Sequence, residues 1–83
     1  MYSKKVKIKT KHGIHMRPAS LIMKAALATE EDVIIKKDNF EINAKSIISI
    51  VTLGAKKSSV VEISSNDKQV VDQIVEILKT KNL

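Results

Sequence analysis

The 83-residue sequence contains no cysteine and only two aromatic residues, and each shortage excludes a class of protein. Without cysteine, neither disulfide bonds nor a cysteine-based metal centre can hold the fold together. Two aromatic rings cannot form the stacking platform that single-stranded nucleic acids need. No hydrophobic run approaches the roughly 20 residues of a membrane span, and Met1 to Lys5 lead into no signal-peptide core. We therefore expect a cytoplasmic protein without membrane insertion.

Length and charge narrow the possibilities further. A chain of 83 residues with 43% hydrophobic content predicts one small domain, residues 1–83. The net charge of +6 is compatible with a basic nucleic-acid-binding βα domain, which is the alternative from a different functional class. However, the first lysines alternate with Val6 and Ile8, as on the solvent face of a half-buried strand. We therefore expect no nucleic-acid binding. Instead, the positive net charge should raise the rate at which the protein encounters acidic proteins.

The only proline, Pro18, marks the start of a helix. Proline is tolerated in a first helical turn, where backbone N–H groups have no partner within the helix. Apolar residues with the helical period follow it, namely Leu21, Ile22, Ala25, Ala26 and Leu27. The spacing leaves Lys24 for the surface and places His15 at the N-terminal cap or one residue outside it.

His15 and Arg17 together could hold a phosphoryl group at this helix start. The free N–H groups and the positive end of the helix dipole attract anions. Histidine is partly neutral at cellular pH, and a neutral ring nitrogen is a nucleophile toward phosphorus. The guanidinium of Arg17 can bind phosphate oxygens bidentately. The spacing alone also fits a capping histidine followed by a solvated arginine.

The middle of the chain predicts a strand, a hairpin and a short helix. Val33 and Ile35 can share one face of a strand. Asp38-Asn39 predicts a tight turn into a strand over residues 40–43, because both residues tolerate left-handed backbone angles. A short helix from Ser46 to Leu53 is closed by Gly54 in the left-handed conformation. Ser46 is a favoured N-cap residue.

The end of the chain predicts a strand over residues 60–63 and a long helix. Asn66 and Gln69 have the spacing of a capping box, and the helix ends near Lys79. Its apolar stripe consists of Val70, Val71, Ile74, Val75, Ile77 and Leu78. The resulting order is βαββαβα, which predicts an α+β fold with one sheet and helices packed on a single face.

Two segments resemble the HPr family, the histidine-containing phosphocarriers of the bacterial phosphoenolpyruvate:sugar phosphotransferase system. Residues 13–20, G-I-H-M-R-P-A-S, are similar to the family's active-site signature G-[IL]-H-A-R-P-A-[ST]. Residues 43–54, N-A-K-S-I-I-S-I-V-T-L-G, are similar to its regulatory serine and the short helix after it. The resemblance implies an open-faced β-sandwich, in which a four-stranded antiparallel sheet carries three helices on one face.

The resemblance also implies a function as a phosphoryl carrier and not as an enzyme. His15 would accept phosphate from phospho-enzyme I at Nδ1 and pass it to enzyme IIA domains during sugar uptake, while Arg17 stabilises the charge. Ser46 matches the position that HPr kinase/phosphorylase modifies in many bacteria. The implied docking surface for partners consists of Met16, Ser20, Lys24, Ile47, Ile48 and Val51. No cofactor is implied, and we expect a monomer.

Some features leave alternatives open. Met16 replaces a small residue of the family, and its thioether would either extend a hydrophobic contact or crowd the ring. His12 would either hold His15 or its phosphate, or be a solvated loop residue. A metal site at His12 and His15 lacks further ligands at suitable spacing, so none is expected.

A regulatory or nitrogen-branch paralogue of the family would keep most of these features. Of Ile47 and Ile48, one should stay outside the core, because neighbouring helical residues point about 100° apart.

Overall fold

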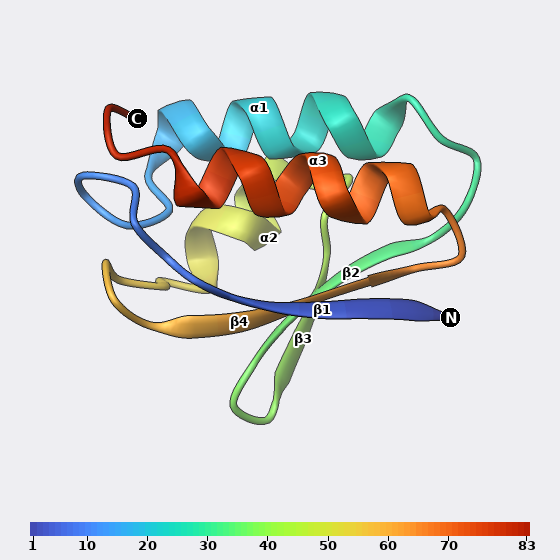
Figure 1. Cartoon of the computed structure of the whole chain (residues 1–83), viewed down its shortest axis with the longest axis horizontal. Coiled ribbons are helices and arrows are strands. Elements are labelled where there is room, and N and C mark those ends of the chain that lie inside the picture. Colours follow the sequence, from blue (N-terminus) through green and yellow to red (C-terminus); the bar gives the residue numbers. More distant parts are fainter.

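The computed structural model describes all 83 residues and has the predicted element order, βαββαβα. The elements are β1 (Tyr2–Lys7), α1 (Met16–Leu27), β2 (Val33–Lys37), β3 (Phe40–Asn43), α2 (Ile47–Thr52), β4 (Val60–Ser65) and α3 (Lys68–Lys79). The strands form one antiparallel sheet in the order β1-β4-β2-β3. All three helices lie on one face of this sheet, as Figure 1 shows. The predicted α+β architecture is confirmed.

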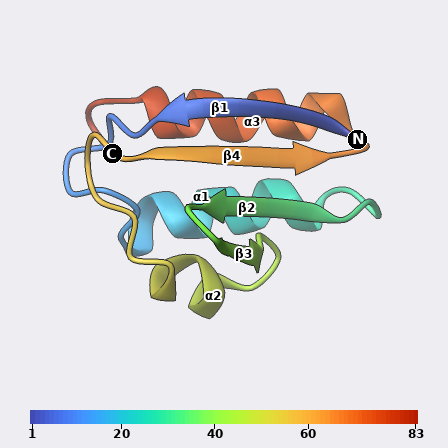
Figure 2. The same cartoon turned by 90° about the horizontal axis from the view of Figure 1, so that it is seen from below.

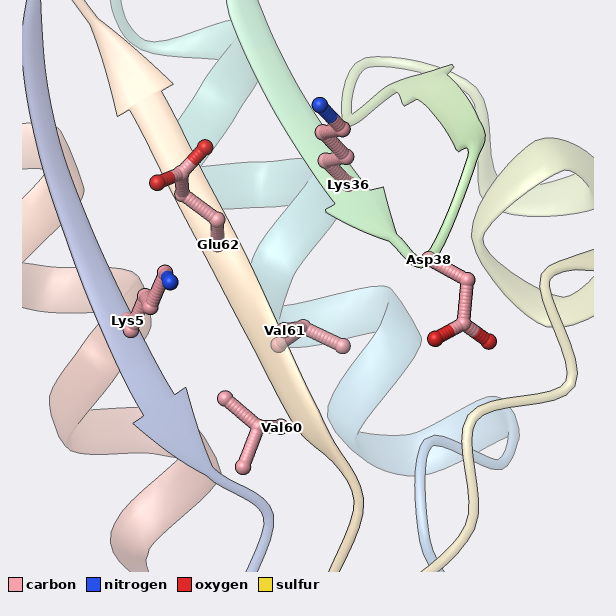
Figure 3. A pocket seen from close by; sticks show the side chains of 6 residues that line it. All are labelled: Lys5, Lys36, Asp38, Val60, Val61 and Glu62. Carbon is pink, nitrogen blue, oxygen red and sulfur yellow. The ribbon is translucent and has the colours of Figure 1, made fainter.

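The other face of the sheet is open to solvent and carries charged side chains in register. Lys5 is paired with Glu62, and Glu62 with Lys36, so opposite charges alternate across three strands. Cross-strand pairs of opposite charge stabilise a sheet, whereas like charges would repel. Figure 3 shows these side chains around a shallow hollow of about 350 Å³ on this face. The prediction that the lysines of the first strand form a solvent face is confirmed for Lys5 and Lys7, which are exposed around buried Val6.

The hydrophobic core lies between the sheet and the helices and contains 19 buried residues. α1 contributes Ala19, Ile22, Ala25 and Ala26 to it. Leu21 and Leu27, however, are 36% and 57% exposed, so their assignment to the apolar face was wrong. Small residues line the buried side of α1, which packs against both α2 and α3 and leaves the two leucines outside.

The hairpin between β2 and β3 has the predicted two-residue turn, with Lys37 paired to Phe40. Only Asp38 takes a left-handed angle, with φ of 55°. β4 is longer than predicted and extends to Ser65 rather than residue 63. The extension occurs because Ser65, at the end of an inner strand, is buried and pairs with both Tyr2 and Val33.

The N-terminal cap of α3 differs from the prediction. Asp67 is the N-cap residue, and its side chain accepts a hydrogen bond from the backbone N–H of Val70 at 3.3 Å. The capping box of Asn66 and Gln69 was therefore wrong. The side chain of Asn66 instead donates to Glu31 at 3.2 Å, and the cap moves one residue along the chain. The C-terminal end at Lys79 is confirmed.

Candidate functional site

His15 is the N-cap residue of α1, as the sequence predicts. Its backbone is extended, and its carbonyl accepts the first helical hydrogen bond from the N–H of Ala19 at 3.0 Å. Pro18 is the third residue of the helix and has no N–H to leave unpaired. The N–H groups of Met16 and Arg17 have no acceptor within the chain. Two free donors and the positive end of the helix dipole therefore lie beside the histidine.

The loop before His15 is held tightly in place. The buried hydroxyl of Thr10 donates to the carbonyl of Gly13 at 2.6 Å, and the Gly13 N–H donates back to the Thr10 carbonyl at 3.1 Å. The N–H of Ile14 donates to the carbonyl of Ala55 at 3.0 Å, and the Ile14 side chain is buried. These bonds fix the backbone on which His15 stands, although the histidine side chain makes no capping hydrogen bond.

Gly13 allows this loop to lie directly against the segment after α2. Its φ is +72°, and a Cβ built on it would be 2.5 Å from the Ala55 carbonyl oxygen. Only glycine combines the left-handed angle with such a close approach. Gly13 belongs to the predicted motif, whereas Thr10 and Ala55 were not predicted as supporting residues. A threonine three residues before a glycine was the available sequence signal for the first of them.

The two ring nitrogens of His15 have different surroundings. The side chain is half-buried, and Nε2 is enclosed without any hydrogen-bond partner. Nδ1 is not enclosed in this way. The exposed ring of His12 contacts the His15 ring edge-on, with centroids 5.7 Å apart and an angle of 68° between the planes. An approaching molecule can therefore reach the imidazole through Nδ1.

Arg17 and Met16 lie on the exposed side of the first turn of α1. No carboxylate lies within 4.0 Å of the Arg17 guanidinium, so its donors are free. Met16 is 60% exposed and points away from the core. Met16 therefore contributes exposed apolar surface next to the histidine. Of the two roles that the sequence left open, this position favours an extended hydrophobic contact over crowding of the ring.

Ser46 is the N-cap of α2, and its hydroxyl oxygen accepts a hydrogen bond from the N–H of Ser49 at 3.3 Å. α2 ends before Gly54, which has a φ of +64°, so both predicted ends of this helix are confirmed. Ile48 is 76% exposed, whereas Ile47 packs partly against the core. The prediction that one of these isoleucines stays outside is confirmed.

The remaining residues of the expected docking surface lie on the same two helices. α1 and α2 pack against each other and are seen side by side in Figure 2. Ser20 is half-buried and Lys24 is exposed on α1, while Val51 is half-buried on α2. The apolar part of this surface comes mainly from Met16 and Ile48, and the charged part from Arg17 and Lys24.

No deep cavity lies at this site. His15 and Arg17 line none of five hollows on the surface of the molecule. No group of three or more histidine, cysteine, aspartate or glutamate side chains is placed to hold a metal ion. None of the helices is both long and apolar enough to cross a bilayer. The site is an open helix start that presents a ring nitrogen, two amides and a guanidinium.

Comparison with known proteins gives a consistent result over nearly the whole chain. Residues 2–80 match the family model described as "PTS HPr component phosphorylation site". The phosphocarrier protein HPr of Vibrio cholerae is 35% identical over 81 residues, covering 94% of this chain and 95% of the relative. A crystal structure of HPr from Bacillus anthracis superposes with a TM-score of 0.86 at 28% identity, covering 93% and 95% of the two chains. A structure of an HPr dimer from Thermoanaerobacter tengcongensis has a TM-score of 0.64 at 33% identity, covering 92% and 90%.

Proposed function

Because this chain belongs to the HPr family of phosphocarriers of the phosphotransferase system, we propose that His15 is its phosphoryl acceptor. In this proposal His15 takes the phosphoryl group from phospho-enzyme I and passes it to enzyme IIA domains during sugar uptake in the cytoplasm. The observation that carries the proposal is the position of His15 as N-cap of α1, beside two backbone amides without acceptors and an unpaired guanidinium.

The geometry supports Nδ1 as the attacking atom. Since Nε2 is enclosed, the lone pair that a donor can reach is the one on Nδ1, with the ring proton on Nε2. In the transfer step, the bond between phosphorus and the donor's histidine nitrogen breaks as the bond from phosphorus to Nδ1 forms. The free N–H groups of Met16 and Arg17 and the Arg17 side chain would stabilise the charge on the three phosphoryl oxygens.

An open site suits a carrier, which must release the group that it accepts. Contacts that bind the phosphorylated form too tightly would slow delivery to the next protein, so stabilisation should be greatest in the transition state. The absence of a cavity at His15 also lets a partner's histidine approach the phosphorus in line. We propose that the protein carries the phosphoryl group without a cofactor and as a monomer. Analytical sedimentation at working concentration would distinguish a monomer from the dimer seen in a structure of a relative.

We assign partner docking to the surface formed by α1 and α2, which consists of Met16, Ser20, Lys24, Ile47, Ile48 and Val51. Exposed apolar side chains at the centre of a polar rim are typical of protein interfaces. Met16 and Ile48 are the most exposed apolar side chains of this surface. A partner that covers them also covers His15, because all these residues lie on two packed helices.

The direct test is incubation of the protein with labelled phosphoenolpyruvate and enzyme I. We expect one phosphoryl group per chain, stable in alkali and labile in acid, located on His15 by peptide mapping. Subsequent addition of a IIA domain should remove the label from the protein. Label on another residue, or label that no IIA domain accepts, would contradict the proposal.

Arg17→Ala should slow phosphoryl transfer from enzyme I by roughly ten- to a hundredfold, because charge-assisted hydrogen bonds to phosphate contribute about 1.5–3 kcal/mol. The transfer rate of Arg17→Lys should lie between the rates of the native protein and Arg17→Ala, since lysine keeps the charge but loses the bidentate geometry. Stopped-flow transfer kinetics measure the effect. The Arg17 side chain is exposed and forms no ion pair, so thermal unfolding should be unchanged in both variants. Equal rates for all three proteins would remove Arg17 from the site.

We propose Ser46 as a regulatory phosphorylation site. Its hydroxyl is half-buried and already faces the free amides of α2, where a phosphate dianion is stabilised. A phosphate there would repel acidic partners from the neighbouring docking surface. Incubation with HPr kinase/phosphorylase and ATP should add one acid-stable phosphate and slow transfer from enzyme I. Ser46→Ala should take up no such phosphate, and unmodified Ser46 under these conditions would count against the assignment.

A further inference from the structure

Seven lysines line two adjoining hollows along β1, the loop before β4 and the end of the chain, outside the α1 and α2 docking surface. Lys7, Lys9, Lys57 and Lys81 line a hollow of about 340 Å³. Lys7 and Lys9 also line an adjoining hollow of about 230 Å³, together with Lys4, Lys5 and Lys79. All seven are exposed. We call this set, Lys4, Lys5, Lys7, Lys9, Lys57, Lys79 and Lys81, the lysine surface.

The lysine surface has almost no compensating negative charge. No carboxylate lines either hollow, and of the seven lysines only Lys4 and Lys79 have one within 4.0 Å. The hollow in Figure 3 is different, because Asp38 and Glu62 share it with Lys5 and Lys36. Lys5 lies opposite Glu62 on β4, but the other four ammonium groups have no carboxylate partner in the chain. Their mutual repulsion favours an external polyanion.

The chemistry of the lysine surface does not match a protein interface or the recognition of single-stranded nucleic acid. It contains no arginine and no aromatic ring, whereas binding hot spots in protein interfaces are rich in both and lysine is depleted there. Stacking of exposed bases also requires aromatic rings. Its apolar residues Val6, Ile8 and Val75 are buried, so none can insert into a partner. Diffuse charge is the only means of binding, and an anionic lipid surface requires nothing more.

The lysine surface lies at the same end of the molecule as the start of α1, but it is turned away from α2. The end of β1, the loop before β4 and the end of α3 lie together at one end of the molecule (Figure 1). β1 and α3 lie at the opposite side of the fold from α2, as Figure 2 shows. A flat surface that contacts β1 and the end of α3 therefore does not cover the exposed side of α2.

We propose that the lysine surface binds the anionic leaflet of a lipid bilayer peripherally, with α2 directed away from the lipid. Each lysine near such a leaflet strengthens binding by about fivefold. The attraction falls off within a Debye length, about 10 Å at 0.1 M salt, so binding weakens steeply as salt rises. Binding through the lysine surface would raise the concentration of the protein next to a membrane, although no part of the protein would insert into the bilayer. The proposal does not depend on His15 chemistry.

The test is sedimentation of the protein with phosphatidylcholine vesicles that either contain or lack phosphatidylglycerol. We expect salt-sensitive binding only to the anionic vesicles. Combined replacement of Lys7, Lys57 and Lys81 by glutamine should weaken binding about a hundredfold. A control with Lys36, Lys37 and Lys68 replaced by glutamine has the same net charge, and should lose less than about fivefold because these lysines line neither hollow.

Three outcomes would overturn the proposal. The two triple variants could weaken equally, which would show an effect of net charge alone. The protein could bind both vesicle types alike or neither. It could also bind an RNA oligonucleotide more tightly than anionic vesicles and lose that binding in the Lys7, Lys57 and Lys81 variant, which would assign the surface to nucleic acid. Circular dichroism confirms folding of each variant, and phosphorylation by enzyme I in lipid-free solution separates this result from the carrier function.

Discussion

His15→Ala is expected to abolish phosphorylation by phosphoenolpyruvate and enzyme I. The imidazole is the nucleophile in the proposed transfer, and no other nucleophile occupies the N-terminus of α1. The fold should be retained, since the His15 side chain makes no hydrogen bond and only its backbone carbonyl caps the helix. The measurement is acid-labile label per chain after incubation, with circular dichroism as the check on folding.

His12→Ala is the matched control, because His12 is the only other histidine and its ring contacts that of His15. We expect this variant to accept one phosphoryl group per chain, as the native protein does. Its transfer rate also decides between the two roles left open by the sequence. An unchanged rate identifies His12 as a solvated loop residue, and a reduced rate identifies it as a support for His15. Label retained in His15→Ala and lost in His12→Ala would reverse the assignment of the acceptor.

Gly13→Ala is expected to have the largest effect on stability of any single glycine substitution in the chain. A left-handed backbone angle costs a residue with a side chain about 1–2 kcal/mol. The new Cβ would also lie 2.5 Å from the Ala55 carbonyl oxygen, which must move and so disturb its hydrogen bond with Ile14. We expect a total loss of about 3 kcal/mol, a large share of the roughly 5–10 kcal/mol typical of a small domain.

The loss can be measured by urea unfolding, with Gly54→Ala as the control. Gly54 has a similar φ of +64°, but its added Cβ would meet only the Thr52 carbonyl at 3.7 Å, an ordinary contact. Gly54→Ala should therefore lose only the backbone contribution, about 1 kcal/mol. Equal losses in the two variants would mean that the loop before His15 can relax away from Ala55. Gly13→Ala should also slow phosphorylation, since it displaces the segment that carries the acceptor.

Local sequence patterns were sufficient for most elements of this fold. Pro18 predicted the start of α1 and the capping position of His15, because proline is compatible only with the first turn. The alternation around Val6 predicted β1, and Ser46 and Gly54 predicted both ends of α2. These features depend on the backbone preferences of a few neighbouring residues. The two motifs that resemble the HPr family then predicted the architecture, which the comparisons support.

The errors occurred where a choice depends on distant parts of the chain. Asn66 and Asp67 are both good N-cap residues, and the contact between Asn66 and Glu31 is made only when the end of β4 lies beside the loop after α1. Leu21 and Leu27 fit an apolar helix face by spacing, but the width of the buried stripe depends on how closely α2 and α3 pack on α1. Neither could be decided from residues near in sequence.

The sequence by itself determined the helices and strands, the position of His15 at the start of α1 and that of Ser46 at the start of α2, because each depends on local backbone chemistry. Only the tertiary structure decided the strand order β1-β4-β2-β3, the support of His15 by Thr10 and Ala55, and the enclosure of Nε2. It also decided that lysines from the two ends of the chain and from the loop before β4 share one surface. Long-range packing brings these residues together, and no local preference encodes which distant segments will meet.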